Sequence, residues 1–64
     1  MNLRHLGVFL SVCDAGNMTA AAEKLHMSQP SVSQAIAELE QHYQVKLFER
    51  LGRKLFITEA GKNL

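Results

Sequence analysis

SQPSVSQAIA, residues 28–37, contains the start of a helix and determines how the rest of the chain is interpreted. Ser28 is suited to the N-cap position, and Pro30 is tolerated in the first turn that follows a cap. Apolar residues then recur at i, i+4, i+7 and i+11, which places them on one helical stripe: Val32, Ile36, Leu39 and Tyr43. We predict that this stripe enters a core and that Met27 staples onto Val32 in front of it.

The opposite face of this helix is small, polar and uncharged. It carries Pro30, Ser33, Gln34, Ala37 and Gln41, and the first acidic residue, Glu38, comes only in the third turn. A helix face in plain contact with water usually carries pairs of Lys and Glu, so their absence needs a physical reason. A polyanion close to this face would repel carboxylates and supplies that reason.

Two shorter helices are expected before this one. In residues 3–13 the apolar stripe is formed by Leu3, Leu6, Leu10 and Cys13, with Phe9 beside it, and it ends at Gly16 and Asn17. Cys13 on that stripe is interpreted as a small buried hydrophobic residue. Thr19 is predicted to cap a second helix, in which the alanines of AAAEKL permit close packing and Leu25 is the main apolar anchor.

The residues after Tyr43 predict a two-stranded hairpin. VKLFER at 45–50 and KLFIT at 54–58 are rich in branched and aromatic residues, and a turn containing Gly52 separates them. Four apolar side chains can close the open end of the three-helix core: Leu47, Phe48, Leu55 and Ile57. Thr58 is expected to cap a further helix at 59–64.

This layout predicts a mainly α fold with a small β-hairpin, namely a winged helix-turn-helix with a three-helix core and a two-stranded wing. With 64 residues the chain is one small domain, which we assign to residues 1–58, and residues 59–64 begin a fourth helix. Residues 46–54 hold four basic residues and Glu49, for a net charge of +3, whereas residues 1–45 carry a net charge of −2. The basic cluster fits either a nucleic-acid contact or a solvated loop.

Composition argues against several other classes of protein. A single cysteine excludes an internal disulfide and suits a reducing cytoplasm, and no apolar run is long enough for a membrane span or a signal sequence. His5, His26 and His42 share no metal-ligand spacing with one another or with Cys13. No His, Cys or carboxylate constellation has catalytic spacing. We therefore expect a cytoplasmic binding protein that is no enzyme and needs no metal or cofactor.

At these residues the sequence resembles the bacterial LysR-type transcriptional regulators. The resemblance covers nearly the whole chain, and it rests on MNLRHL at 1–6, GNMTAAAEKLHMSQPSVSQAIAELE at 16–40, and VKLFER, GRK and ITEAG in order. It implies an amino-terminal domain that binds double-stranded DNA, with the helix starting at Gln29 in the major groove and the wing on the backbone or minor groove. It also implies a longer protein, in which a linker helix pairs subunits into a dimer or tetramer and a C-terminal domain binds a small-molecule effector.

The resemblance carries over to individual residues. Gln29, Pro30, Ser31 and Ser33 match the start of the family's recognition helix, while Arg50 and Arg53 match its wing positions. Lys54 is expected to project with Arg53 from the tip of the predicted hairpin. The chain departs from the family at Gln34, where many relatives have Arg, and at Ala37, where a polar or basic residue is frequent. Gln34 could instead bind adenine in a bidentate manner, a preference worth about 1–3 kcal/mol.

The predicted mechanism is binding in which Arg50, Arg53, Lys54 and the helix start position the domain, while Gln29, Ser33 and Gln34 discriminate bases. Purely structural roles are also open for two residues of this region. Arg50 could pair with a carboxylate such as Glu38, and Ser28 is better explained as a cap than as a base contact. The alternative function is a winged helix that binds another protein, which would require an exposed apolar patch on the helix starting at Gln29.

Overall fold

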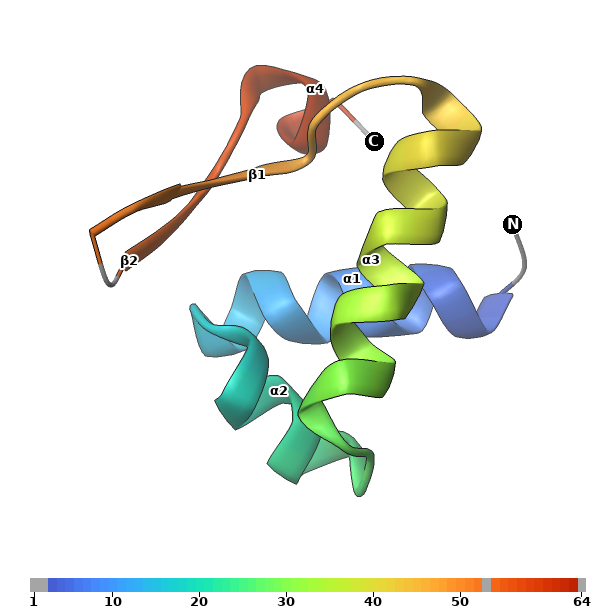
Figure 1. Cartoon of the computed structure of the whole chain (residues 1–64), viewed down its shortest axis with the longest axis vertical. Helices are drawn as coiled ribbons and strands as arrows, with labels where there is room; N and C mark the ends of the chain where they lie inside the picture. Colours follow the sequence, from blue (N-terminus) through green and yellow to red (C-terminus); the bar gives the residue numbers. More distant parts are fainter. Residues whose placement is uncertain (1–2, 53, 64) are drawn as a thin grey trace.

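The computed structural model describes residues 3–52 and 54–63 and shows three packed helices with a hairpin beside them (Figure 1). The helices are α1 (Leu3–Ala15), α2 (Met18–Leu25) and α3 (Gln29–Tyr43). Strands β1 (Phe48–Leu51) and β2 (Lys54–Ile57) follow, and the short helix α4 (Glu59–Lys62) comes last. The fold class predicted from the sequence, a mainly α winged helix-turn-helix, is confirmed.

Helix α1 enters the core by a different face from the one predicted. Val8, Phe9 and Val12 are buried, whereas Leu3 and Leu10 are 86% and 58% exposed and Cys13 is also exposed. The buried face is fixed by a distant contact, because the Phe9 ring packs on Phe48 of β1 with ring centroids 5.4 Å apart. The predicted burial of Cys13 is therefore wrong, although partial desolvation still raises the pKa of its thiol.

The N-cap of helix α2 lies two residues earlier than predicted. Asn17, and not Thr19, is the N-cap, and its side-chain oxygen accepts a hydrogen bond of 2.7 Å from the Ala20 N–H. The carboxamide oxygen of Asn17 accepts the capping hydrogen bond that the sequence predicts for the Thr19 hydroxyl. The alanines rather than Leu25 anchor this helix, since Ala21 and Ala22 are buried and Leu25 is only half-buried.

Helix α3 follows the predicted stripe for most of its length. Val32, Ile36 and Leu39 are buried, together with Ala35, and Ser28 is the N-cap as predicted. Tyr43 was expected in the core and is 38% exposed, because the last turn of α3 extends past the packed helices. The helix ends at Gln44, whose φ of 56° is the left-handed conformation common after a helix.

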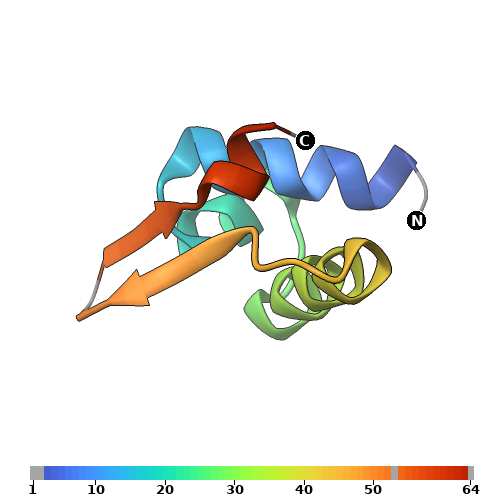
Figure 2. The same ribbon diagram turned by 90° about the horizontal axis from the view of Figure 1, so that it is seen from above.

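The hairpin confirms the predicted wing and closes the core. Its register pairs Phe48 with Ile57 and Leu51 with Lys54, and the turn residue Gly52 has a φ of 64°, which favours glycine. Leu47 and Phe48 are buried, whereas Leu55 and Ile57 are half-buried. Figure 2 shows the hairpin projecting away from the helices, with its tip far from both chain ends.

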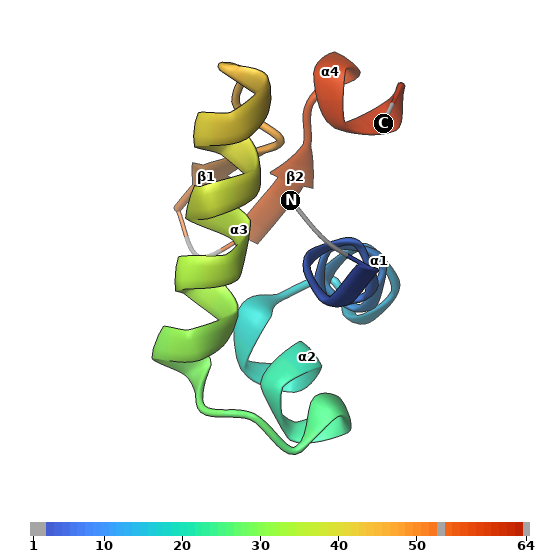
Figure 3. The ribbon, with the colours of Figure 1, turned by 90° about the vertical axis from the view of Figure 1, so that its right-hand side faces the viewer.

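A single carboxylate ties the end of α3 to the hairpin. Glu40 accepts a hydrogen bond of 2.8 Å from the Leu47 N–H and a longer one from the Phe48 N–H. Figure 3 shows α3 in front of the hairpin, with α1 seen end-on to one side of α3. The first two turns of α3 and the hairpin thus lie on one side of the molecule, where the candidate site is found.

Candidate nucleic-acid interface

The turn between α2 and α3 sets the direction in which α3 leaves the core. His26 has a φ of 56°, and the N–H of Met27 donates to Ala22 O at 2.9 Å. Ser28 Oγ then accepts from the Ser31 N–H at 3.2 Å, which satisfies one amide at the start of the helix. The turn is short and held by these hydrogen bonds, so α2 and α3 pack as a helix-turn-helix with the start of α3 at the surface.

We define the outward face of α3 by four residues, all exposed: Pro30, Gln34, Ala37 and Gln41. At about 100° per residue these side chains lie opposite the buried stripe centred on Leu39. None of the four carries a charge, and only Gln34 and Gln41 have side-chain hydrogen-bonding groups. The face is slim and can both donate and accept hydrogen bonds, as contact with base edges in a major groove requires.

A chain of side-chain hydrogen bonds runs along one edge of this face. Gln29 Nε2 donates to Ser33 Oγ at 2.7 Å, and the Ser33 hydroxyl donates to the sulfur of Met18 at 3.2 Å. The single hydrogen of the Ser33 hydroxyl is used in the second bond, so the lone pair that is left can only accept. Met18 at the start of α2 therefore sets the hydrogen-bonding role of Ser33, which is half-buried.

The Ser31 hydroxyl, unlike that of Ser33, can donate a hydrogen bond to an outside partner. Its Oγ accepts a hydrogen bond of 2.8 Å from the Ser28 hydroxyl, which leaves the hydrogen of the Ser31 hydroxyl available for an acceptor outside the helix. A phosphate oxygen is such an acceptor, whereas Ser33 in its present arrangement could only accept from a base amino group. The two serines therefore have different chemical capacities although both lie in the first two turns.

A hollow of about 330 Å³ separates the start of α3 from the hairpin. Arg50 lines it from β1 and Gln29 from α3, and Asn17 and Thr19 line it from the start of α2. Arg50 is exposed, and among the ion pairs formed by residues 3–52 and 54–63 none includes it. The alternative in which Arg50 pairs with Glu38 is wrong, because Glu38 binds His5 instead.

The predicted wing residues do not share one face of the hairpin. Arg50 pairs with Leu55, and Leu51 pairs with Lys54, so the alternation of side chains along a strand places Arg50 and Lys54 on opposite faces. Lys54 is exposed at the hairpin tip, and Arg50 lies on the face toward α3. Arg53, the other basic residue predicted to contact DNA, lies outside the described residues.

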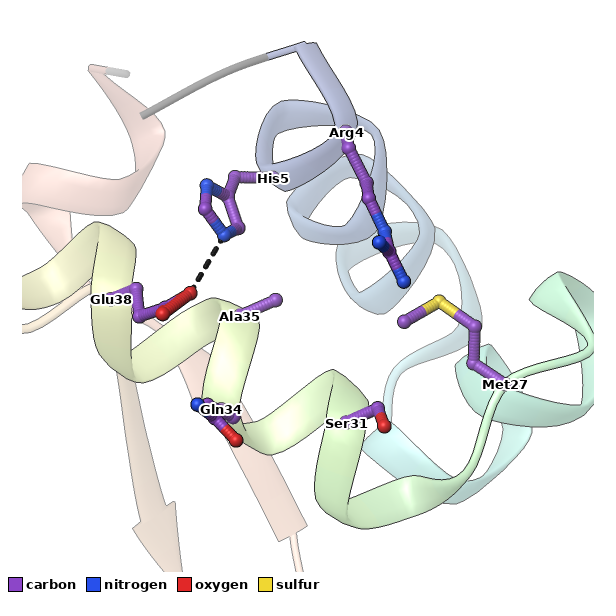
Figure 4. Close-up of a pocket in the computed structure, with 7 residues that line it drawn as sticks. All are labelled: Arg4, His5, Met27, Ser31, Gln34, Ala35 and Glu38. Atoms are coloured by element: carbon purple, nitrogen blue, oxygen red, sulfur yellow. Dashed lines mark hydrogen bonds and ion pairs between the residues drawn. The ribbon is translucent and has the colours of Figure 1, made fainter.

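A second hollow, of about 250 Å³, lies on the other side of α3 (Figure 4). Ser31, Gln34 and Glu38 line it from α3, and Arg4 and His5 line it from the first turn of α1. His5 Nε2 lies 2.8 Å from a Glu38 carboxylate oxygen, which joins the two helices. The sequence pattern did not single out Arg4 or Met18 as site residues, because neither belongs to the polar helix face or to the basic segment.

The described residues contain no group of three or more His, Cys, Asp or Glu side chains placed to hold a metal ion. In the same part of the chain, no helix combines the length and the apolar character needed to cross a membrane.

Comparison with known proteins agrees with this geometry. The sequence pattern of bacterial regulatory helix-turn-helix proteins of the lysR family matches residues 3–62, and the chain belongs to this family. It is 50% identical over 64 residues to an HTH-type transcriptional regulator from the ibpB-leuC intergenic region of Azotobacter vinelandii, covering 100% of the chain and 44% of that relative. It is 52% identical over 62 residues to the Hca operon transcriptional activator HcaR of Escherichia coli, covering 97% of the chain and 21% of that protein.

The structure of a CbnR DNA-binding domain in complex with DNA superposes with a TM-score of 0.93. That chain is 43% identical in sequence, and the match covers 98% of this chain and 72% of the other. The present chain thus spans less than half the length of the two curated relatives.

Proposed function

We propose that this chain is the DNA-binding domain of a LysR-type regulator of transcription and that it binds DNA in a sequence-specific manner. The observation that carries the proposal is the uncharged, polar outward face of α3 beside the exposed Arg50. A helix of this kind can enter a major groove without bringing a carboxylate against phosphate. Family membership and the likeness to a regulator domain in complex with DNA support the same function.

In the proposed complex α3 lies in the major groove and the hairpin contacts the backbone or the minor groove. Gln34 and the Gln29–Ser33 pair discriminate bases, with Ser33 acting as an acceptor, while Pro30 packs closely against the groove. Ser31, Arg50, Arg53 and Lys54 bind phosphates and position the domain. This role is one of binding and not of catalysis, and it places the protein in the cytoplasm, beside the bacterial chromosome.

For the whole protein we propose at least a dimer whose subunits occupy two half-sites separated by one helical turn of DNA, about 34 Å, or a multiple of it. Residues 59–64 would start the linker helix that joins the subunits, and residues 1–58 form the DNA-binding unit. A small-molecule effector would act on a separate C-terminal domain. A nuclease footprint of the full-length protein that covers a single half-site would contradict this assembly.

The alternative function, a protein-interaction module, requires an apolar patch on α3. The exposed apolar residues of the outward face are Pro30 and Ala37. The most exposed large apolar side chains lie on α1 and on the hairpin, and Tyr43, which is 38% exposed, lies at the far end of α3. No feature of α3 favours this alternative, and the experiment below separates the two functions.

An amide chemical-shift titration with a mixed-sequence DNA duplex tests the proposed function. We expect shifts concentrated at residues 28–37 and in the hairpin at 50–54, and we expect them to fade as salt rises, since each neutralised phosphate changes the slope of log K against log salt by about −0.9. A protein of similar size and net charge without this face serves as the control. Absence of shifts at low salt, or shifts scattered over the surface, would favour the protein-interaction module.

A further inference from the structure

Arg4 is a cation at the protein surface that the basic segment of the sequence does not include. It lies in the first turn of α1, its side chain is exposed, and no ion pair formed within residues 3–52 and 54–63 includes it. In Figure 4 its guanidinium points from α1 into the hollow beside α3, toward Met27 and Ser31. An arginine with five donors is thus directed at the flank of the candidate interface.

The carboxylate in the same hollow is already engaged. Glu38 points toward His5, whose Nε2 lies 2.8 Å from the carboxylate oxygen, and Arg4 lies apart from that pair (Figure 4). The other residues of the hollow are neutral: Met27, Ser31, Gln34 and Ala35. In the same hollow, the Ser31 hydroxyl retains the hydrogen that the helix does not use. The hollow therefore presents a cation and a hydroxyl donor to the same space.

Arg4 and Arg50 lie on opposite flanks of α3. Viewed down the axis of α3, with Pro30 at the centre of the outward face, Ser31 and Glu38 lie about 80–100° around the helix to one side. Ser33 and Gln29 lie about 60–100° around it to the other side. The first flank borders the hollow of Arg4, and the second borders the hollow of Arg50. A major groove about 12 Å wide has one phosphate chain along each side, so a helix seated in it has phosphates on both flanks.

We infer that Arg4, together with the Ser31 hydroxyl, binds a DNA backbone phosphate on the strand opposite to the one that Arg50 contacts. This contact rests on the proposed function, and it extends the DNA-binding surface to α1. Two arginines from distant parts of the chain then hold α3 between the two phosphate chains. The contact fixes the depth and tilt of α3 in the groove and carries no sequence preference of its own.

Binding of a labelled mixed-sequence duplex, followed by fluorescence anisotropy at several salt concentrations, tests this inference. Arg4→Gln should weaken binding about tenfold at low salt, in line with the loss of one hydrogen bond to a charged group. It should also make the slope of log K against log salt shallower by about 0.9, and Arg4→Lys should largely restore that slope. Lys62→Gln removes one positive charge on α4 instead and should leave the slope near that of the unchanged chain.

The double variant Arg4→Gln/Arg50→Gln tests whether the two arginines bind different phosphates. Separate phosphates predict additive effects, with the slope shallower by about 1.8. A slope unchanged in Arg4→Gln, or changed equally by Lys62→Gln, would overturn the contact while leaving the proposed function intact. Effects that do not add would overturn the two-strand arrangement. If the unchanged chain fails to bind the duplex at all, the proposed function fails, and the contact fails with it.

Discussion

Two serines in the first two turns of α3 show how neighbouring residues control the chemistry of a site. Ser28 donates to Ser31, whereas Ser33 receives its bond from Gln29 and donates to Met18. The same residue type can therefore donate to an outside partner at one position and only accept from one at the other. Residue type alone cannot distinguish these roles, because they depend on Met18, 15 residues away along the chain.

Gln34 provides a prediction at the scale of one side chain. Its exposed amide can make a bidentate contact with adenine, so Gln34→Ala should lower discrimination at one base pair by about 1–3 kcal/mol. Duplexes selected by the unchanged chain from a random library, then varied one position at a time, measure this loss. Lys54→Ala is the matched control, because loss of a phosphate contact should weaken all duplexes alike. Equal losses on every duplex for Gln34→Ala would contradict base recognition by this residue.

Residues whose role is local were predicted correctly from the sequence. Ser28 and Thr58 are caps in the structure, because a cap needs only a hydroxyl placed three residues before a free amide. Asn17 was missed for a related reason, since both it and Thr19 could serve and only the actual path of the chain selects one. Arg4 had no local signal, because its position in the site depends on how α1 packs against α3.

At the scale of elements, α4 is held by a close approach at Gly61. A Cβ atom at this position would lie 2.6 Å from the Leu47 carbonyl oxygen and 2.7 Å from Ile57 Cγ1. Gly61→Ala should therefore lower the free energy of unfolding by about 1–3 kcal/mol, although alanine is the better helix former. Urea unfolding followed by circular dichroism measures the change.

Gly7→Ala is the control for this substitution. Gly7 lies within α1, and a Cβ atom there would meet no other atom within 4 Å. Helix propensity alone should then apply, and we expect the free energy of unfolding to rise by about 0.5–1 kcal/mol. Stabilisation by both substitutions would show that α4 is not packed closely against β2.

Elements with one apolar stripe were easier to predict than those with two. In α3 the buried residues form a single stripe opposite a polar face, so periodicity identified both faces, apart from the exposed Tyr43. In α1 apolar residues occur on two faces, and periodicity favoured Leu3 and Leu10 over Val8 and Val12. The choice depends on the contact between Phe9 and Phe48, which joins residues far apart in sequence.

At the scale of the whole molecule, a small core makes each fully buried side chain important. Leu39 is fully buried, and Leu39→Ala should cost about 2–5 kcal/mol. A domain below about 70 residues rarely has more than about 3–5 kcal/mol of stability, so we expect this variant to be largely unfolded at 25 °C. We expect the variant to lose the helical circular-dichroism signal of the folded chain, and to lose DNA binding with it.

Leu10→Ala makes the same chemical change on the exposed face of α1. Because Leu10 is 58% exposed, the free energy of unfolding should change by less than about 0.5 kcal/mol. Circular dichroism of the two variants at 25 °C, where Leu10→Ala should stay folded, therefore tests whether the Leu10 side of α1 lies outside the core. Comparable destabilisation by both substitutions would support the apolar stripe inferred from the sequence over the arrangement in the structure.

The contacts of Thr58 have a mechanical consequence. Its N–H binds Leu47 O at 2.9 Å and its hydroxyl donates to Lys46 O, while Gly61 lies directly against Leu47 and Ile57. These contacts join α4 directly to the segment that precedes β1. A torque applied to α4 would therefore be transmitted through Leu47 to Glu40 on α3.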